Sequence, residues 1–133
     1  MKEEFKKYLF ENCIKNDEKR ILLAVSGGVD SMLMLHLFSG LEDIRISVAH
    51  CNYQLRGMES KLDELLVKET CNKLGFTFHH QSFNTNQYAK NNHLSVQMAA
   101  RELRYNWFNE LIKEYNYDLI ATAHHKNDVV ETM

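Results

Sequence analysis

Apolar and polar residues alternate along the chain with two different periods, and these periods predict strands separated by helices. A nearly continuous apolar run from Arg20 to Val25 and a strict alternation over residues 44–48 are both typical of strands. A third strand is predicted to start at Phe76, and a fourth to run from Asp118 to His124. These segments supply four strands of one sheet.

Helical spacing fills the intervals between the strands. The predicted helices cover, approximately, Lys2 to Asn16, Met32 to Phe38, Glu59 to Leu74 and Ser95 to Tyr115. The second of them is almost wholly apolar before it stops at Gly40, so we expect it to be buried on all sides. The last carries a clear core stripe of Val96, Ala99, Ala100, Leu103, Trp107, Leu111 and Tyr115.

In the predicted helix from Glu59 to Leu74, leucines supply the apolar spacing: Leu62, Leu65, Leu66 and Leu74. Ser60 and Asp63 have the spacing of a reciprocal N-terminal cap. The Asn- and Gln-rich segment before Ser95 has no predicted element.

Strands that alternate with helices are typical of a parallel sheet with right-handed crossovers. We therefore predict one α/β domain with a doubly wound, Rossmann-like parallel sheet over the 133 residues, which contain no proline and no repeat. In such sheets, ligands bind at the carboxyl ends of the strands. Ser26, His50 and His124 stand at the ends of the first, second and fourth predicted strands.

The segment from Ser26 to Ser31 joins the first strand to the apolar helix. Adjacent glycines let a backbone approach a ligand closely, and the N–H groups that open a helix have no partners within it. An anion accepts these hydrogen bonds and lies at the positive end of the helix dipole. The segment has neither the lysine of a Walker A loop nor Gly-x-Gly-x-x-Gly spacing. We predict a nucleotide-binding loop formed by Ser26, Gly27, Gly28, Val29, Asp30 and Ser31.

Composition narrows the class of protein further. The chain is 44% hydrophobic, yet no apolar run approaches the about 20 residues that span a bilayer. A cytoplasmic protein without membrane contact is therefore expected. The net charge of −2 predicts weak RNA binding by this chain alone, because Lys and Arg supply most affinity for nucleic acid. Three cysteines without Cys-x-x-Cys spacing indicate reduced thiols.

Three more polar blocks follow the glycine loop in order. A loop from His50 to Ser60 carries Arg56, and residues 99–105 read Ala-Ala-Arg-Glu-Leu-Arg-Tyr. Residues 121–132 read Ala-Thr-Ala-His-His-Lys-Asn-Asp-Val-Val-Glu-Thr. The first of these blocks, taken alone, is also consistent with a plain connecting loop. The four blocks together are more specific than any one of them.

Ser-Gly-Gly-Val-Asp-Ser resembles the PP-loop of the N-type ATP pyrophosphatases, and the four ordered blocks closely resemble the tRNA(Ile)-lysidine synthetases. The resemblance spans Ile21 to Thr132. It implies a PP-loop ATP pyrophosphatase fold, with residues 1–133 as a single ATP-binding domain that is incomplete at its C-terminus. Members of that family continue to tRNA-binding domains. The chain departs from the family pattern at Tyr53, commonly a histidine, and at Asn127 and Val129.

The resemblance implies a two-step reaction on the wobble cytidine of tRNA(Ile) with a CAU anticodon. ATP adenylates the C2 carbonyl oxygen and releases pyrophosphate, with Mg²⁺ held by phosphate and carboxylate oxygens. The ε-amine of free L-lysine then attacks C2, AMP leaves, and lysidine remains. ATP and Mg²⁺ are the implied cofactors, and tRNA(Ile) and L-lysine are the implied partners. The oligomeric state is left open.

The resemblance places the departing pyrophosphate on the glycine loop. It implies that His50 and Arg56 contact the nucleotide and that Arg104 is a catalytic residue at a phosphate or the tRNA. The simpler alternative for Arg104 is a solvated ion pair with Glu102 or Glu110.

Three acid–base candidates remain. Asp30 is the candidate that orients lysine or takes its proton, since an ammonium group is not a nucleophile. An acid at a helix N-terminus is also favourable without any chemistry. His124 and Asp128 are implied catalytic residues, and no metal ligand is predicted among them. Asp128 and Glu131 also have the spacing of an N-cap pair, which predicts a helix after the fourth strand.

Two alternative functions stay open. Transfer of AMP followed by attack of sulfur would make the chain a tRNA 2-thiolation enzyme, although the cytidine-thiolating relatives carry Cys-x-x-Cys pairs for an iron–sulfur cluster. The other alternative is an ATP-binding module without turnover.

Overall fold

The computed structural model describes residues 20–41, 44–125 and 128–132; for residues 123–125 and 128–132 it describes the backbone alone. The helix expected over about Lys2 to Asn16 lies outside these residues. No helix within the described ranges is both long and apolar enough to cross a membrane.

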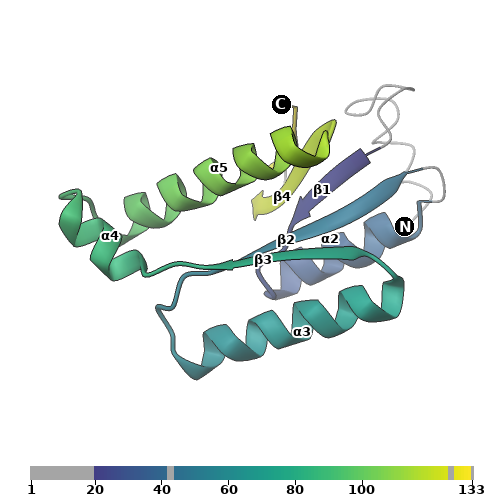
Figure 1. Ribbon diagram of the computed structural model, residues 1–133. Coiled ribbons are helices and arrows are strands. Elements are labelled where there is room, and N and C mark those ends of the chain that lie inside the picture. The colour runs from purple at the N-terminus through teal and green to yellow at the C-terminus, as the bar shows by residue number, and fades with distance from the viewer. Residues whose placement is uncertain (1–19, 42–43, 126–127, 133) are drawn as a thin grey trace.

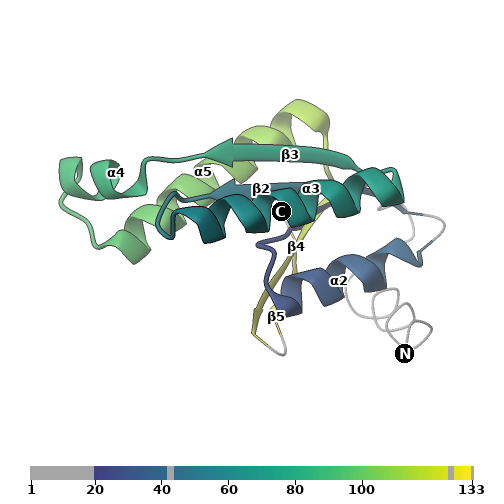
Figure 2. The same cartoon turned by 90° about the horizontal axis from the view of Figure 1, so that it is seen from below.

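Five strands form one sheet in the order β3-β2-β1-β4-β5. Figure 1 labels β1 to β4, and Figure 2 labels β5. They are β1 (Arg20–Ala24), β2 (Arg45–Asn52), β3 (Thr77–Ser82), β4 (Leu119–His125) and β5 (Asp128–Thr132). The first four are parallel, as predicted. The chain builds β1, β2 and β3 outward in one direction and then places β4 on the other side of β1. The strand order therefore reverses between β1 and β4.

The segment after β4 is a strand, where the sequence predicts a helix. Asp128–Thr132 pairs antiparallel with β4, and Val130 lies opposite Ala121. Three of its five residues are β-branched and favour extended backbone, and the pairing gives hydrogen-bond partners to the outer edge of β4. The predicted N-cap pair of Asp128 and Glu131 is therefore wrong.

Helices cover both faces of the sheet, which confirms the doubly wound arrangement. They are α2 (Val29–Ser39), α3 (Met58–Leu74), α4 (Thr85–Asn91) and α5 (Val96–Tyr115). Figures 1 and 2 show α2 and α3 on one face and α5 on the other. Gly40 ends α2, as expected. The hydroxyl of Ser95 caps α5 by accepting from the N–H of Met98 at 3.1 Å. The unpredicted α4 begins after Asn84, whose side chain accepts from the N–H of Gln87 at 3.2 Å.

Two apolar clusters flank the sheet, because successive residues of a strand point to opposite faces. Ile21 and Leu23 pack with α2 and α3, whereas Leu22 packs with Phe108 and Leu111 of α5. This explains why β1 reads as a continuous apolar run: both of its faces are covered.

The burial of α2 differs from the sequence expectation, and α3 buries only part of its apolar surface. In α2, Leu33 is 48% exposed, so the helix buries one face and not its whole surface. In α3, Val67 and Cys71 are buried, while Leu62, Leu65 and Leu66 are exposed. The spacing of apolar residues identifies a helix, but the neighbouring elements determine how much of the helix surface is buried.

The predicted stripe of α5 is correct in its middle and wrong at its ends. Val96 and Tyr115 lie in the first and last turns and are exposed, and the stripe omits Phe108, which is buried.

Candidate functional site

Hydroxyl groups organise the loop between β1 and α2. The Oγ of Ser31 accepts hydrogen bonds from the N–H groups of Ser26 at 3.2 Å and Gly27 at 3.1 Å. It donates to the carbonyl oxygen of Gly28 at 3.0 Å, and the Oγ of Ser26 accepts from the N–H of Gly28 at 3.2 Å. Ser31 is buried, so it holds this loop from the inside.

The same loop leaves the N-terminus of α2 open. Gly28 is the N-cap, and among the described residues no side chain caps the helix. The N–H groups of Val29 and Asp30 therefore have no partner within the helix. Both residues are exposed. A helix N-terminus of this kind favours an anion.

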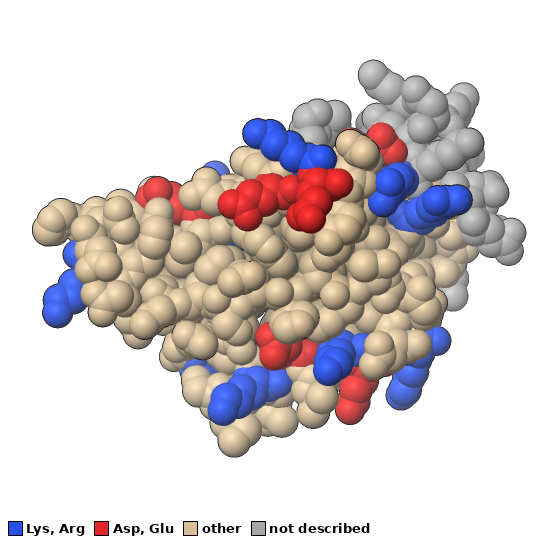
Figure 3. All heavy atoms as spheres, in the orientation of Figure 1, with Lys and Arg blue, Asp and Glu red and all other residues tan. Residues whose placement is uncertain are grey.

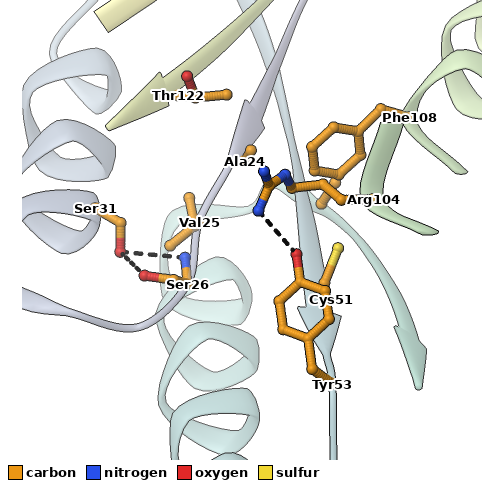
Figure 4. Close-up of a pocket in the computed structure, with 10 residues that line it drawn as sticks. Ala24, Val25, Ser26, Ser31, Cys51, Tyr53, Arg104, Phe108 and Thr122 are labelled. Atoms are coloured by element: carbon orange, nitrogen blue, oxygen red, sulfur yellow. Dashed lines mark hydrogen bonds between the residues drawn. The ribbon is translucent and has the colours of Figure 1, made fainter. Parts of the chain in front are cut away.

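A cavity of about 250 Å³ opens beside the loop at the carboxyl ends of β1, β2 and β4 (Figure 4). It lies where the strand order reverses, which is the usual ligand position in open parallel sheets. Its lining consists of Ala24, Val25, Ser26, Ser31, Ala49, Cys51, Tyr53, Arg104, Phe108 and Thr122. Loop and cavity are therefore continuous.

Cys51, Tyr53 and Arg104 form a polar wall of the cavity. The Nη1 of Arg104 donates to the hydroxyl of Tyr53 at 3.4 Å, and the guanidinium lies over the ring of Tyr105, 5.4 Å from its centroid. Burial raises the pKa of Cys51 to about 11. Burial, with the neighbouring Cys51, also raises the pKa of Tyr53. Both groups are therefore neutral near pH 7, while the guanidinium stays charged.

Two buried polar atoms that line this cavity, Nε of Arg104 and Oγ1 of Thr122, have no hydrogen-bond partner among the described residues. Such atoms cost free energy unless water or a ligand satisfies them. Arg104 instead donates to Tyr53, which directly follows β2, and the solvated ion pair with Glu102 or Glu110 is not formed. The alternative that the sequence allowed for Arg104 is therefore wrong.

His50 lies inside the sheet at the end of β2. It is 2% exposed, and its Nδ1 lies 2.8 Å from the carbonyl oxygen of Val25. A carbonyl oxygen only accepts, so Nδ1 must carry the proton. The ring also stacks with Phe78, with centroids 6.5 Å apart. His50 thus anchors the residue that precedes the glycine loop, and the nucleotide contact implied for it remains a prediction.

Arg56 lines a second cavity of about 230 Å³ that shares Ser26, Cys51 and Tyr53 with the first. Its Nη2 lies 2.6 Å from Oδ2 of Asp63, and its backbone N–H donates to the Oγ of Ser60 at 3.3 Å. The reciprocal cap predicted for Ser60 and Asp63 is wrong, because Gly57 is the N-cap and α3 starts ahead of both. The side chain of Arg56 is 60% exposed.

The remaining predicted residues lie at the same edge of the sheet. His124 is near the end of β4, and Asp128 begins β5, where it pairs with His125. Their side chains are outside the described part. Among the side chains that the structure does describe, no group of three or more His, Cys, Asp or Glu is placed to hold a metal ion.

Charges of both signs are interspersed on the face of the molecule in Figure 3. Lys and Arg side chains there alternate with Asp and Glu and form no continuous basic patch. This agrees with the small net charge of −2.

The fold and the site define a doubly wound α/β domain whose first loop and main cavity meet at the topological switch point. The family model of the PP-loop domain matches residues 1–133, and the chain belongs to this family.

Curated relatives agree with this assignment. The chain is 46% identical over 116 residues to the tRNA(Ile)-lysidine synthase of Bacteroides thetaiotaomicron, covering 87% of this chain and 27% of that protein. It is 46% identical over 116 residues to the synthase of Chlorobaculum tepidum, and the match covers 85% of this chain and 35% of that protein. It is 42% identical over 130 residues to the synthase of Petrotoga mobilis, and the match covers 96% of this chain and 42% of that protein. The chain thus spans between 27% and 42% of the length of these relatives.

Solved structures confirm the predicted fold class. A U34-tRNA thiolase from Methanococcus maripaludis superposes with a TM-score of 0.72 at 19% identity, covering 96% of this chain and 45% of that chain. An NH3-dependent NAD synthetase from Campylobacter jejuni also superposes with a TM-score of 0.72, at 16% identity, and the match covers 94% of this chain and 56% of that chain. At these identities the likeness concerns the fold alone.

Sequence reasoning did not identify several residues that line the main cavity: Cys51, Tyr53, Phe108 and Thr122. Three of them could have been found by their position, since Cys51 and Thr122 lie near the carboxyl ends of β2 and β4 and Tyr53 directly follows β2. Phe108 could not have been found in this way, because its position at the cavity depends on how α5 is rotated against the sheet.

Proposed function

We propose that the chain binds ATP, with the phosphates on the glycine loop and the adenosine in the 250 Å³ cavity. One observation carries the proposal: Ser26 and Ser31 organise the loop and also line the cavity. A ligand in that cavity is therefore in reach of the open N-terminus of α2, which favours phosphate oxygens. The apolar wall of Ala24, Ala49 and Phe108 suits a purine ring.

In this proposal the loop and Arg104 stabilise the pyrophosphate as it leaves. The N–H groups of Val29 and Asp30 are free to donate to it, and Arg104 offsets its negative charge. The residues present also fit Mg²⁺, because Asp30 offers an exposed carboxylate next to the loop and this ion prefers oxygen ligands. Mg²⁺ would neutralise phosphate charge. His50 and Arg56 support the loop from β2 and the second cavity.

The complete reaction proposed is that of a tRNA(Ile)-lysidine synthetase, a ligase acting in the cytoplasm. The three relatives that carry this name, at 42% to 46% identity, support it. ATP adenylates C2 of the wobble cytidine in the CAU anticodon, and the ε-amine of L-lysine displaces AMP. Asp30 orients or deprotonates the lysine amine. His124 and Asp128 contribute from the end of β4 and the start of β5.

The experiment incubates the protein with ATP, Mg²⁺, labelled L-lysine and an unmodified tRNA that carries a CAU anticodon. Label in the tRNA, with one AMP released per lysine, is the expected result. A matched tRNA with a CAC anticodon serves as the control and stays unlabelled. AMP release that depends on a sulfur donor and not on lysine indicates thiolation instead. ATP binding without any AMP release indicates a nucleotide-binding module.

The position of the cysteines weighs against thiolation through a cluster of cysteine ligands. Cys51 packs on the α5 face of the sheet, whereas Cys71 is buried in α3 on the opposite face. Two thiols on opposite faces of a sheet cannot ligate one iron–sulfur cluster.

A further inference from the structure

Arg104 extends from α5 to the main cavity, where its hydrogen-bond partner is an uncharged side chain. Its Nη1 donates to the Tyr53 hydroxyl at 3.4 Å, and Figure 4 shows the guanidinium and the phenol directed toward each other at the cavity wall. Among the side chains that the structure describes, no carboxylate lies within ion-pair distance of Arg104. A carboxylate would offset the charge of the guanidinium, whereas a phenol orients the group and leaves its charge intact.

Tyr53 is itself held by several contacts. Its carbonyl oxygen accepts from Oγ1 of Thr85, which is 1% exposed, at 2.8 Å. Its ring stacks on Phe83 with centroids 6.0 Å apart and 25° between the planes. Phe83 in turn meets the ring of Trp107 on α5 edge to face at 6.2 Å. The phenol therefore has a fixed position relative to the helix that carries Arg104.

The phenol also stays protonated. Burial is the main cause that raises the pKa of Tyr53, and the neighbouring Cys51 adds to it. Arg104 donates to the phenol oxygen, so the phenol keeps its own hydrogen. The partner of the guanidinium thus carries no charge over the physiological range of pH.

We propose that Tyr53 is a positioning residue that holds the guanidinium of Arg104 at the cavity with its charge uncancelled, so that this charge recognises the phosphates of the ligand and not its nucleoside. The inference rests on the proposed binding of ATP in this cavity. Tyr53 should therefore contribute to affinity only when the ligand carries phosphates. A residue that merely shapes the cavity would contribute equally to the affinity for ATP and for adenosine.

The experiment measures ATP and adenosine affinities by competition with a fluorescent ATP analogue. The proteins are the unaltered chain, Tyr53→Phe, Arg104→Gln and the double variant, each checked by thermal unfolding. We expect Tyr53→Phe to weaken ATP binding by about three- to tenfold and to leave adenosine binding unchanged. In the Arg104→Gln background, Tyr53→Phe causes no further loss, because both changes remove one interaction.

Tyr88→Phe is the matched control. It removes a phenol whose hydroxyl donates to Glu102 at the same distance of 3.4 Å, but outside the residues that line the cavity. Both affinities are expected to stay unchanged.

An equal loss of ATP and adenosine affinity in Tyr53→Phe, or independent losses in the double variant, overturns the positioning role. Unchanged ATP affinity in Tyr53→Phe overturns it as well. Absence of ATP binding by the unaltered chain overturns the proposed function itself, and the role of Tyr53 with it. That result is distinct, because it involves no variant.

Discussion

The Cβ of Asp63 lies 2.9 Å from the point that a Cβ on Gly27 would occupy, so α3 closes directly onto the glycine loop. Gly27 also has a φ of +98°, which side-chain-bearing residues rarely adopt. Steric and conformational reasons thus both require glycine at this position. Arg56 contacts Asp63 at 2.6 Å and thereby joins the loop after β2 to α3, the helix that lies against the glycine loop.

We expect Gly27→Ala to lower the free energy of unfolding by about 1–3 kcal/mol, from backbone strain and the clash with Asp63. It should also weaken ATP binding, because relief of the clash moves the loop. Urea unfolding followed by circular dichroism, together with ATP titration, measures both effects.

Gly28→Ala is the control for this prediction. Its φ is −74°, and the nearest atom to an added Cβ is Oγ of Ser26 at 3.5 Å. It should fold with nearly unchanged stability. Equal destabilisation by the two substitutions would contradict the special role of Gly27.

Phe108 and Val96 test the burial of α5. Phe108 is 3% exposed and packs in the cluster under α5, so Phe108→Ala should cost about 3–5 kcal/mol of unfolding free energy. Val96 is 39% exposed in the first turn, so Val96→Ala should change it by about 0.5 kcal/mol at most. Urea unfolding of the two variants gives the comparison. A larger cost for Val96→Ala would show that the helix is rotated differently against the sheet.

The stability of the fold should fall in mild acid through His79. Burial lowers the pKa of His79 from 6.5, and Glu114 opposes the shift only in part. The imidazole is packed against Tyr115 and its Nε2 lies 2.7 Å from the Tyr117 hydroxyl. The folded state therefore binds this proton more weakly than the unfolded state, so stability is retained above about pH 6.5 and lost as the pH falls below it.

Denaturant midpoints measured between pH 7.5 and 5 test this expectation. His79→Phe should flatten the pH dependence, whereas His36→Gln, at an exposed position of α2, should not. The same slope in His79→Phe as in the unaltered protein would assign the effect to other groups.

Cys51 should react slowly with iodoacetamide. Its pKa of about 11 leaves little thiolate at pH 8, so the alkylation rate should rise about tenfold per pH unit up to pH 10. Because Cys51 lines the main cavity, ATP should slow the reaction. Peptide mapping by mass spectrometry quantifies the modification.

Cys71, buried in α3, is the internal control, and its alkylation rate should not respond to ATP. Alkylation of Cys51 at a rate independent of ATP would contradict binding in this cavity.

Local signals predicted most of the architecture. The apolar run of β1, the glycine loop and the stop at Gly40 depend on residues close in sequence, and each was correctly assigned. The segment from Asp128 was not, because its cap-like spacing is a weaker signal than pairing with β4. The leucine spacing correctly located α3 but could not show that most of these leucines are exposed, because periodicity shows that a helix has an apolar side without showing what covers it.

The candidate site divides in the same way. The sequence by itself determined the α/β class, the alternation of the first four strands with helices and the loop from Ser26 to Ser31, because glycine conformation and helix termini are local properties. Only the tertiary structure decided that Arg104 meets Tyr53 and that Asp63 meets Gly27. These contacts join residues 51 and 36 positions apart in the chain, and their geometry depends on how α3 and α5 pack against the sheet.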